Sequence, residues 1–225
     1  MQSMIPLDLF EDPPPATAAQ RAQLAPGAVL MRGFALDGDV ELLQAVESVM
    51  VQAPPRHWQT PGGGTMSVAT TRCGPVGWVP GGPDGGHHYA AQHPRTGQPW
   101  PAMPCCLMDF ALCAALEAGY PQFVPDSCLI NHYAPGAKLG LHQDKYETDL
   151  RAPIVSLSLG LPAVFLFGGL QRSDRSDRYR LIHGDVVVWG GPSRLRFHGV
   201  LPVADGTHAL VGRRRLNVTF RKIGR

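Results

Sequence analysis

The feature that most constrains this chain is a succession of short strand-like runs that fills its C-terminal half. From Ser127 onward, β-branched and aromatic residues recur in short runs between turn-forming glycine, proline and aspartate residues. This pattern is typical of an all-β domain. The predicted strands are Cys128–Tyr133, Lys138–His142, Ile154–Leu159, Ala163–Phe167, Tyr179–His183, Asp185–Trp189, Leu195–His198 and Arg213–Arg221.

Helices are predicted only upstream of these strands. One spans residues 37–52, with Asp37 in the position of an N-cap, and a second spans residues 105–119 and ends at Gly119. The apolar stripe of the first helix is expected at Val40, Leu43, Val46 and Met50. Helices followed by about eight short strands favour a mainly β fold with flanking helices, a double-stranded β-helix or jelly roll. A sandwich of the immunoglobulin type fits the strand pattern as well.

A single domain is expected over residues 1–225, because a chain of this length can form one substantial core. Residues 1–25 are interpreted as a loosely packed arm, and residues 127–225 as the β core. Segment 53–104 is rich in glycine and proline, which predicts turns and a long loop. Loops placed ahead of a β scaffold commonly carry recognition, although this segment could also be plain coil.

Composition excludes several classes of protein. No run of about 18 apolar residues is present, and the N-terminus lacks the basic-then-apolar order of a signal peptide. We therefore expect a soluble cytoplasmic protein with no membrane partner. The five cysteines show no C-x-x-C spacing, which excludes a zinc site and a disulfide scaffold as interpretations.

Charge is distributed unevenly along the chain. Residues 171–225 contain 12 Lys+Arg against 4 Asp+Glu, whereas residues 1–170 contain 8 against 14. A solvated surface is the usual explanation for such charge. Its concentration in one part of the chain also suits a polyanionic partner such as a nucleic acid.

A candidate metal site is formed by His142-Gln143-Asp144 together with the later His198. Two imidazoles and one carboxylate in this order are the ligands of the facial triad of non-haem Fe(II) oxygenases. His142 and Asp144 are two positions apart, so they would share one face of a strand. A rival pair occurs at His183-Gly184-Asp185, but there Gly184-Asp185 reads as a tight turn, and the histidines that follow are close in sequence.

The last predicted strand has one polar and one apolar face. Leu216, Val218 and Phe220 alternate with the polar residues Arg215, Asn217, Thr219 and Arg221. A solvated polar face is the simplest explanation. Two guanidinium groups beside an amide and a hydroxyl could also bind a small dicarboxylate. Asn131 and Tyr133 repeat the same spacing on an earlier strand and are candidates for the same ligand.

These segments together resemble a known family. The motifs are N-x-Y-x-P-G within residues 131–138, His142-Gln143-Asp144-Lys145, the distal His198, and R-x-N-x-T-F-R at residues 215–221. They resemble the AlkB family of bacterial Fe(II)/2-oxoglutarate-dependent DNA alkylation-repair dioxygenases. Further similarity at residues 60–63, 77–78 and 99–104 extends the resemblance over nearly the whole chain beyond the N-terminal arm.

The resemblance implies a cofactor and two cosubstrates: Fe(II), 2-oxoglutarate and O2. The iron would be held by His142, Asp144 and His198. Arg215 would pair with the distal carboxylate of 2-oxoglutarate, and Arg221 would lie near the end that chelates iron. The remaining contacts to 2-oxoglutarate would come from Asn131, Tyr133, Asn217 and Thr219.

The resemblance also implies a substrate and a reaction. Trp78 would stack on an extruded base beneath a nucleotide-recognition lid over residues 53–104. Further contacts to the substrate would come from His87, His88, Tyr89, Tyr146 and Arg172. Methyl groups on bases such as 1-methyladenine and 3-methylcytosine would be oxidised and released as formaldehyde, with succinate and CO2 as coproducts. The partner would be single- or double-stranded DNA, or RNA, and the enzyme a monomer.

Two positions depart from the family pattern. Tyr146 stands where the well-known bacterial members have an acidic residue, with Glu147 directly after it, and His87 stands where a phenol is usual. These two positions bear on the preferred lesion and strand. A 2-oxoglutarate-dependent hydroxylase acting on RNA, a protein or a small molecule is an alternative function. A catalytically silent nucleic-acid-binding module is another, but it would need neither the three metal ligands nor Arg215.

Overall fold

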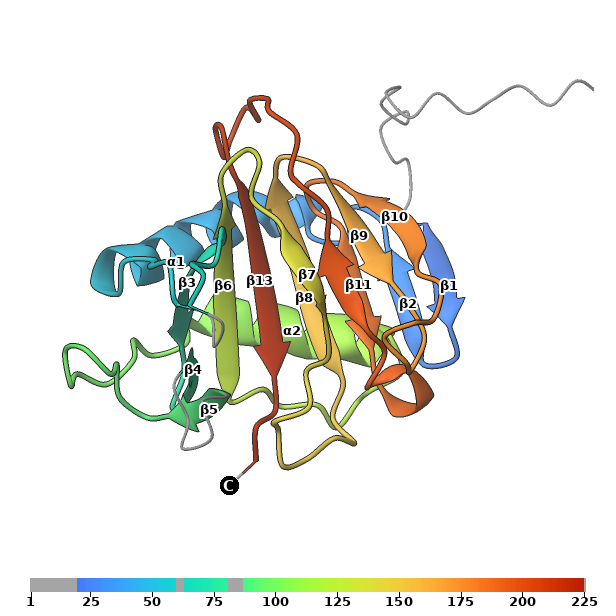
Figure 1. Ribbon diagram of the computed structural model, residues 1–225, viewed down its shortest axis with the longest axis horizontal. Coiled ribbons are helices and arrows are strands. Elements are labelled where there is room, and N and C mark those ends of the chain that lie inside the picture. The colour runs from blue at the N-terminus through green and yellow to red at the C-terminus, as the bar shows by residue number, and fades with distance from the viewer. Residues whose placement is uncertain (1–19, 60–62, 81–86, 225) are drawn as a thin grey trace, which may run out of the picture.

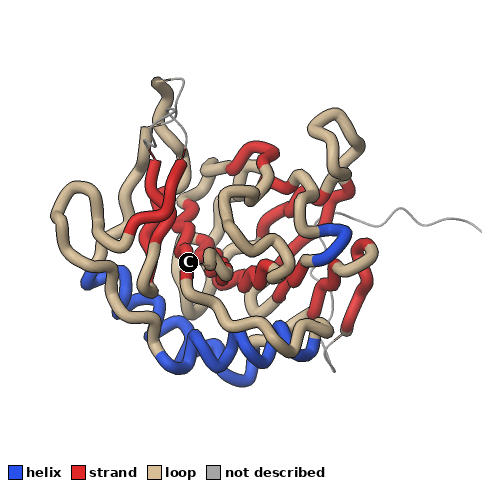
Figure 2. Tube along the Cα trace, turned by 90° about the horizontal axis from the view of Figure 1, so that it is seen from below, coloured by secondary structure: helices blue, strands red, loops and turns tan. Residues whose placement is uncertain are grey.

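The computed structural model describes residues 20–59, 63–80 and 87–224 of the chain (Figure 1). Two antiparallel sheets face each other, and two helices cover the outer face of the larger sheet. The helices are α1 (Asp39–Gln52) and α2 (Cys105–Glu117). They lie together on one side of the molecule, separated from the smaller sheet by the larger one (Figure 2). Among the described residues, neither helix has the length and apolar character needed to cross a bilayer.

The larger sheet has seven strands and is antiparallel throughout. Its order is β1 (Arg21–Ala25), β2 (Ala28–Met31), β11 (Val186–Trp189), β8 (Ile154–Gly160), β13 (Arg215–Arg221), β6 (Ser127–Tyr133) and β3 (Ala69–Cys73). The smaller sheet runs in the order β10 (Asp177–Leu181), β9 (Ala163–Phe167), β12 (His198–Val200) and β7 (Leu139–His142). This arrangement confirms the predicted jelly roll.

Strand β13 occupies an inner position in the larger sheet and is buried along its whole length. Its side chains alternate between the two faces of the sheet, as the sequence predicted. Leu216, Val218 and Phe220 belong to the core between the sheet and the helices, which also contains Leu107 of α2 and Val46 of α1. The opposite face of β13 therefore directs its polar side chains into the space between the two sheets.

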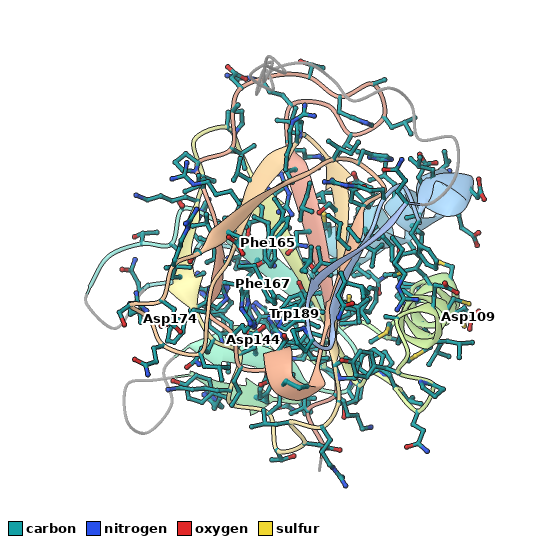
Figure 3. All side chains as sticks on the ribbon, turned by 90° about the vertical axis from the view of Figure 1, so that its right-hand side faces the viewer. Asp109, Asp144, Phe165, Phe167, Asp174 and Trp189 are labelled. Carbon is teal, nitrogen blue, oxygen red and sulfur yellow. The ribbon has the colours of Figure 1, made fainter. Side chains whose placement is uncertain are left out.

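The space between the sheets is filled by an apolar core over only part of its extent. Phe165, Phe167 and Trp189 belong to this second core, and their rings are in contact with one another. Figure 3 shows these side chains in the interior of the molecule, with Asp144 close by. Beyond this core, polar residues of both sheets face a cavity.

A separate hairpin closes one end of this space. Strands β4 (Gly77–Pro80) and β5 (His87–Ala90) pair only with each other and form a sheet of their own. In the register of this hairpin, Trp78 lies directly opposite Tyr89. Both residues belong to the predicted recognition segment 53–104.

The N-terminal part of the fold differs from the sequence-based expectation. Residues 21–25, assigned to a loose arm, form strand β1 at the edge of the larger sheet, and β2 follows it inside the sheet. Residues 1–19 lie outside the described residues. Strand β3 was also not predicted, since Ala69–Cys73 lies in the segment interpreted as loop. The β core therefore extends beyond residues 127–225.

Several element boundaries also differ. Helix α1 begins at Asp39 with Gly38 as N-cap, after a short 3-10 helix that contains Asp37. Its buried face consists of Leu42, Val46 and Val49, whereas Val40 is 49% exposed, so the predicted stripe was rotated toward solvent. Strand β12 begins at His198 rather than Leu195, because the 3-10 helix Gly191–Ser193 is followed by a turn at residues 194–195.

Candidate active site

A cavity of about 500 Å3 lies between the two sheets and beneath the β4–β5 hairpin. Thirteen of the site residues predicted from the sequence line this cavity. They are Trp78, Tyr89, Asn131, Tyr133, His142, Asp144, Tyr146, Arg172, His198, Arg215, Asn217, Thr219 and Arg221. The structure therefore collects residues from both sheets, the hairpin and the loop after β7 around one space.

The three predicted metal ligands meet at one end of the cavity. His142 ends β7 and His198 begins β12, and the pairing of these strands places the two residues opposite each other. Asp144 lies in the loop beyond β7, with its carboxylate oxygens 3.9 Å from His142 Nε2 and 3.6 Å from His198 Nε2. The candidate ligand atoms all lie within 4.8 Å of one another. Among the described residues, this is the group of histidine and acidic side chains that could hold a metal ion.

The two imidazoles are oriented for metal binding by backbone carbonyls. His142 Nδ1 lies 2.9 Å from the carbonyl oxygen of Gly140, and His198 Nδ1 lies 3.1 Å from that of Arg196. Each Nδ1–H can donate to its carbonyl, which leaves the Nε2 lone pair for a metal. Burial, with His198 nearby, lowers the pKa of His142 to about 4, so this imidazole is neutral at physiological pH. The donor set fits Fe(II).

Asp144 is held as a carboxylate by its surroundings. Arg221 donates a hydrogen bond of 2.7 Å to Asp144 Oδ2, and Arg194 donates one of 2.6 Å to the backbone oxygen of Asp144. Burial opposes ionisation of this carboxyl group. The Arg221 guanidinium, aided by His198 and His142, nevertheless holds the pKa of Asp144 well below its usual range. Asp144 therefore carries the negative charge that a divalent ion requires.

Arg215 offers buried hydrogen-bond donors that suit an anionic ligand. Its side chain is 1% exposed, and one nitrogen donates to Ser158 Oγ at 3.0 Å. Within the described part of the chain, the other guanidinium nitrogens, Nε and Nη1, have no hydrogen-bond partner, and the hydroxyl of the neighbouring Tyr133 has none either. Buried unpaired donors are costly, and a carboxylate would satisfy them. The site therefore fits the distal carboxylate of 2-oxoglutarate.

Asn217 lines the cavity, and its side-chain amide is hydrogen-bonded to neighbouring residues. Its amide nitrogen donates to Ser156 Oγ at 2.8 Å and to the backbone oxygen of Leu157 at 3.0 Å. Its amide oxygen accepts hydrogen bonds from Asn131 and Thr219, both at 3.2 Å. Asn217 has two amide hydrogens, so its donors are already used within the protein. It positions the neighbouring polar side chains along the cavity wall.

Glu147 and Arg194 contact the site residues, and the sequence did not reveal these contacts. The Glu147 carboxylate accepts a hydrogen bond of 2.8 Å from the Tyr89 hydroxyl and lies 3.3 Å from Arg194 and 3.6 Å from Arg221. It therefore links the hairpin to strand β13. Because its side chain is 1% exposed, Glu147 cannot take over the role of an acidic residue at position 146. Sequence spacing alone gives no signal for Arg194, which comes from the turn before β12.

The remaining predicted substrate residues are distributed around the cavity opening. Tyr146 is 48% exposed, and Lys145 Nζ lies 5.8 Å from the centre of its ring. Arg172 donates to the backbone oxygen of Leu141 at 2.8 Å. His88 is exposed and is not among the lining residues. His87 lies at the start of β5, opposite Pro80, and its role stays a prediction.

The rival pair, His183 and Asp185, is hydrogen-bonded to other parts of the fold. His183 Nδ1 accepts a hydrogen bond of 2.9 Å from the backbone N–H of Gly160, and its Nε2 lies 3.0 Å from Asp39 of α1. Asp185 accepts bonds from Arg32 and from the backbone of Gly33 and Ile182. These residues join the N-terminal part of the chain to the larger sheet, and they do not form a metal site.

Comparison with known proteins agrees with this geometry. Residues 27–221 match the family model described as "2OG-Fe(II) oxygenase superfamily". The chain is 54% identical to the alpha-ketoglutarate-dependent dioxygenase AlkB of Salmonella typhimurium (96% of this chain, 97% of the relative) and 53% identical to that of Escherichia coli (97% and 99%). The structure of OsALKBH1 matches with a TM-score of 0.77 and 30% identity, covering 90% of this chain and all of that one.

Proposed function

Because the chain belongs to the AlkB family of the 2OG-Fe(II) oxygenase superfamily, we propose that its cavity brings an alkylated nucleic-acid base to an iron held by His142, Asp144 and His198. The protein is an Fe(II)/2-oxoglutarate-dependent dioxygenase that acts in alkylation repair by oxidative demethylation. The single observation that carries the proposed site is the meeting of these three ligands with the unpaired donors of Arg215 in one cavity.

The protein's own residues bind and orient the reactants. Arg215 and Tyr133 offer their unpaired donors to the distal carboxylate of 2-oxoglutarate, and Arg221 holds Asp144 in place. When bound, Fe(II) supplies the redox chemistry by which O2 oxidises the N-methyl group to N-hydroxymethyl while 2-oxoglutarate becomes succinate and CO2. The N-hydroxymethyl group then breaks its C–N bond, which releases formaldehyde and returns the proton to the base nitrogen.

The position of the cavity supports base extrusion. A methyl group on the pairing edge of a base cannot reach a buried site while the base is stacked in a duplex. Trp78 and Tyr89 of the hairpin line the same cavity as the metal ligands, so an extruded base could lie between the hairpin and the triad. Stacking on an aromatic ring such as Trp78 offsets about 1–3 kcal/mol of the cost of extrusion. Within segment 53–104, the β4–β5 hairpin is therefore proposed as the nucleotide-recognition lid, whereas β3 of the same segment belongs to the larger sheet.

The proposed substrate is single- or double-stranded DNA that carries an alkylated base, bound by a monomer of the enzyme. A single strand avoids the cost of breaking a base pair, so it should be the better substrate. RNA oligonucleotides of the same sequence test the alternative polymer, and sedimentation of the enzyme with and without DNA tests the monomer.

The test is turnover after anaerobic loading with Fe(II). Oxygen, 2-oxoglutarate and a single-stranded oligonucleotide with one methylated base are then added. Loss of one methyl group by mass spectrometry, with an equal amount of formaldehyde, is the expected result. Succinate production without demethylation would instead favour a hydroxylase with another substrate. Failure to bind Fe(II) in the presence of 2-oxoglutarate would contradict the proposed metal site.

A further inference from the structure

Arg72 is a buried cation that has no acidic partner among the described residues. It lies on β3, its side chain is 0% exposed, and one nitrogen donates to Thr70 Oγ1 at 2.9 Å. Among the described residues, its Nε and Nη1 have no hydrogen-bond partner. Burial, with Arg221 nearby, lowers the pKa of Arg72 to about 9, which still leaves the guanidinium charged at neutral pH. An uncompensated buried charge is expensive, so its surroundings need an explanation.

Three tryptophans surround the guanidinium. Its central carbon lies 4.7 Å from the ring centre of Trp100, 5.4 Å from that of Trp58 and 5.6 Å from that of Trp78. Cation–π attraction of this kind is strongest when the cation is removed from water. The Cβ of any larger residue at position 77 would meet the Arg72 side chain, so Gly77 allows the hairpin to lie directly over it.

The position of Trp78 places this charge behind the wall of the cavity. Trp78 lines the cavity, whereas Arg72 does not. The guanidinium thus lies over the Trp78 ring from a residue outside the cavity lining. A cation on one side of an aromatic ring draws electron density toward itself, and it also repels a second cation on the other side. A stacked base thus meets a ring with a positive charge behind it.

The acidic groups of the cavity do not counter this charge. The carboxylates that line it, among the described residues, are Asp144 and Glu147. Asp144 belongs to the metal triad and bonds Arg221, and Glu147 is buried against Tyr89, Arg194 and Arg221. Lys145 and Arg172 add two further cations to the lining. Where an acidic side chain could contact a base edge, the chain has Tyr146.

We propose that Arg72 is a positioning residue that holds Trp78 in place and, through its charge, makes the base site discriminate against cationic alkylated bases in favour of neutral ones. The inference rests on the proposed function, because it assumes that Trp78 stacks on the substrate base. It concerns the choice among bases, and it leaves the iron and cosubstrate sites as described.

The test compares two methylated bases of nearly the same shape and different charge. 3-Methylcytosine is cationic at neutral pH, whereas 3-methyluracil is neutral and differs from it by one exocyclic group. Each is placed in the same single-stranded oligonucleotide, and kcat and KM are measured for both with the wild-type enzyme and with Arg72→Met. Removing the charge should raise the relative kcat/KM for the cationic base roughly tenfold, through its KM, as expected for two charges separated by one ring.

Two further variants make the result specific. Arg72→Lys keeps the charge and should keep the wild-type ratio of the two bases. Arg151→Met removes an exposed arginine that is paired with Asp149 outside the cavity, and it should leave both bases unchanged. If Arg72→Met lowered turnover of both bases equally, Arg72 would be purely structural and the inference would fail. If Arg72→Met does not fold, Arg72→Lys alone tests the inference. A change in the ratio of kcat/KM for the two bases in Arg72→Lys would then overturn the inference. Absence of demethylation of either base by the wild type would contradict the proposed function instead.

Discussion

At the scale of single residues, the side chains of the site have lone pairs or hydrogen-bond donors that remain free to bind a ligand in the cavity. The imidazoles of His142 and His198 use Nδ1 on backbone carbonyls, which leaves Nε2 for the metal. Arg215 and Tyr133 retain unpaired donors in a buried setting. These local arrangements decide between two His-x-Asp pairs that look alike in the sequence, because both ring nitrogens of His183 already have partners.

The choice between the pairs can be tested directly. His142→Ala should abolish demethylation, because it removes one of three protein ligands from the metal. His183→Ala should lower thermal stability, since it breaks the contacts to Gly160 and Asp39, while kcat below the melting temperature stays within about twofold of wild type. Formaldehyde release and thermal unfolding measure the two effects. Activity that survives His142→Ala but not His183→Ala would show that the wrong pair has been assigned to the metal.

Tyr146 should influence the choice of base. A carboxylate at this position would attract a cationic base at the cavity opening, whereas a phenol can only stack or form neutral hydrogen bonds. Tyr146→Asp is therefore expected to raise the ratio of kcat/KM for 3-methylcytosine over 3-methyluracil by about tenfold, with demethylation retained. Tyr146→Phe serves as the neutral control. An unchanged ranking of methylated bases in Tyr146→Asp would refute this role.

At the scale of elements, one carboxylate connects the hairpin with the strand that carries the cosubstrate residues. Glu147 accepts a hydrogen bond from Tyr89 of β5 and lies beside Arg221 of β13. Burial, opposed by Arg221 and aided by Glu147 and Asp144, raises the pKa of Tyr89, so the phenol stays protonated and can donate. The hairpin is thus tied to the site by a contact outside its own two-stranded sheet.

Loss of this contact should affect binding of the oligonucleotide. Tyr89→Phe removes a hydrogen bond to a charged group, which is worth about 1.5–3 kcal/mol in general, and it frees the hairpin from Glu147. We expect KM for the methylated oligonucleotide to rise about tenfold while KM for 2-oxoglutarate changes less than twofold. Tyr179→Phe, on β10 in the smaller sheet, is the matched control. An equal rise of both constants would mean that the hairpin does not act separately on the substrate.

Whether a strand could be predicted from the sequence depended on which of its faces are buried. In β13 one face is apolar and the other polar, so alternation revealed both the strand and the candidate ligands. In β3 every residue of Ala-Thr-Thr-Arg-Cys is buried, and Thr70 and Arg72 are polar residues in the interior. Such a strand has no polar–apolar alternation to detect. The hairpin was likewise hidden in a segment dominated by glycine and proline.

The site was predictable to the extent that its residues lie in recognisable motifs. The metal ligands and the polar residues of β13 and β6 were identified from spacing and resemblance, and the structure places them around one cavity. The partners that position them come from distant segments, such as Arg194 against Asp144 and Glu147. These contacts depend on how loops meet in three dimensions, which no spacing in the sequence records.

At the scale of the whole molecule, part of the positive charge of residues 171–225 lies beside the cavity opening. Arg172 lines the cavity in the loop between β9 and β10, and Arg175 and Arg178 are exposed in the same loop and in β10. A strand of nucleic acid that enters the cavity could continue along these side chains. The affinity for DNA should therefore depend on salt.

The salt dependence gives a prediction for this surface. For single-stranded DNA, log Kd should rise linearly with the logarithm of the salt concentration, with a slope of about 0.7 for each phosphate that is neutralised. The double variant Arg175→Gln and Arg178→Gln should reduce that slope by about one, whereas Arg151→Gln should not change it. Fluorescence anisotropy with a labelled oligonucleotide under anaerobic conditions measures the slope. An unchanged slope in the double variant would exclude these arginines from the DNA path.

The independence of the β4–β5 sheet has a consequence for how such an enzyme could diversify. Because these strands pair only with each other, residues could be inserted into their connection without changing the register of any strand that carries a metal ligand. New targets could thus be acquired by altering the hairpin while the oxidation machinery is inherited unchanged. Arg72 is the exception, since it lies on β3 of the larger sheet but contacts Trp78 of the hairpin, so a substitution at this position would affect both parts of the molecule.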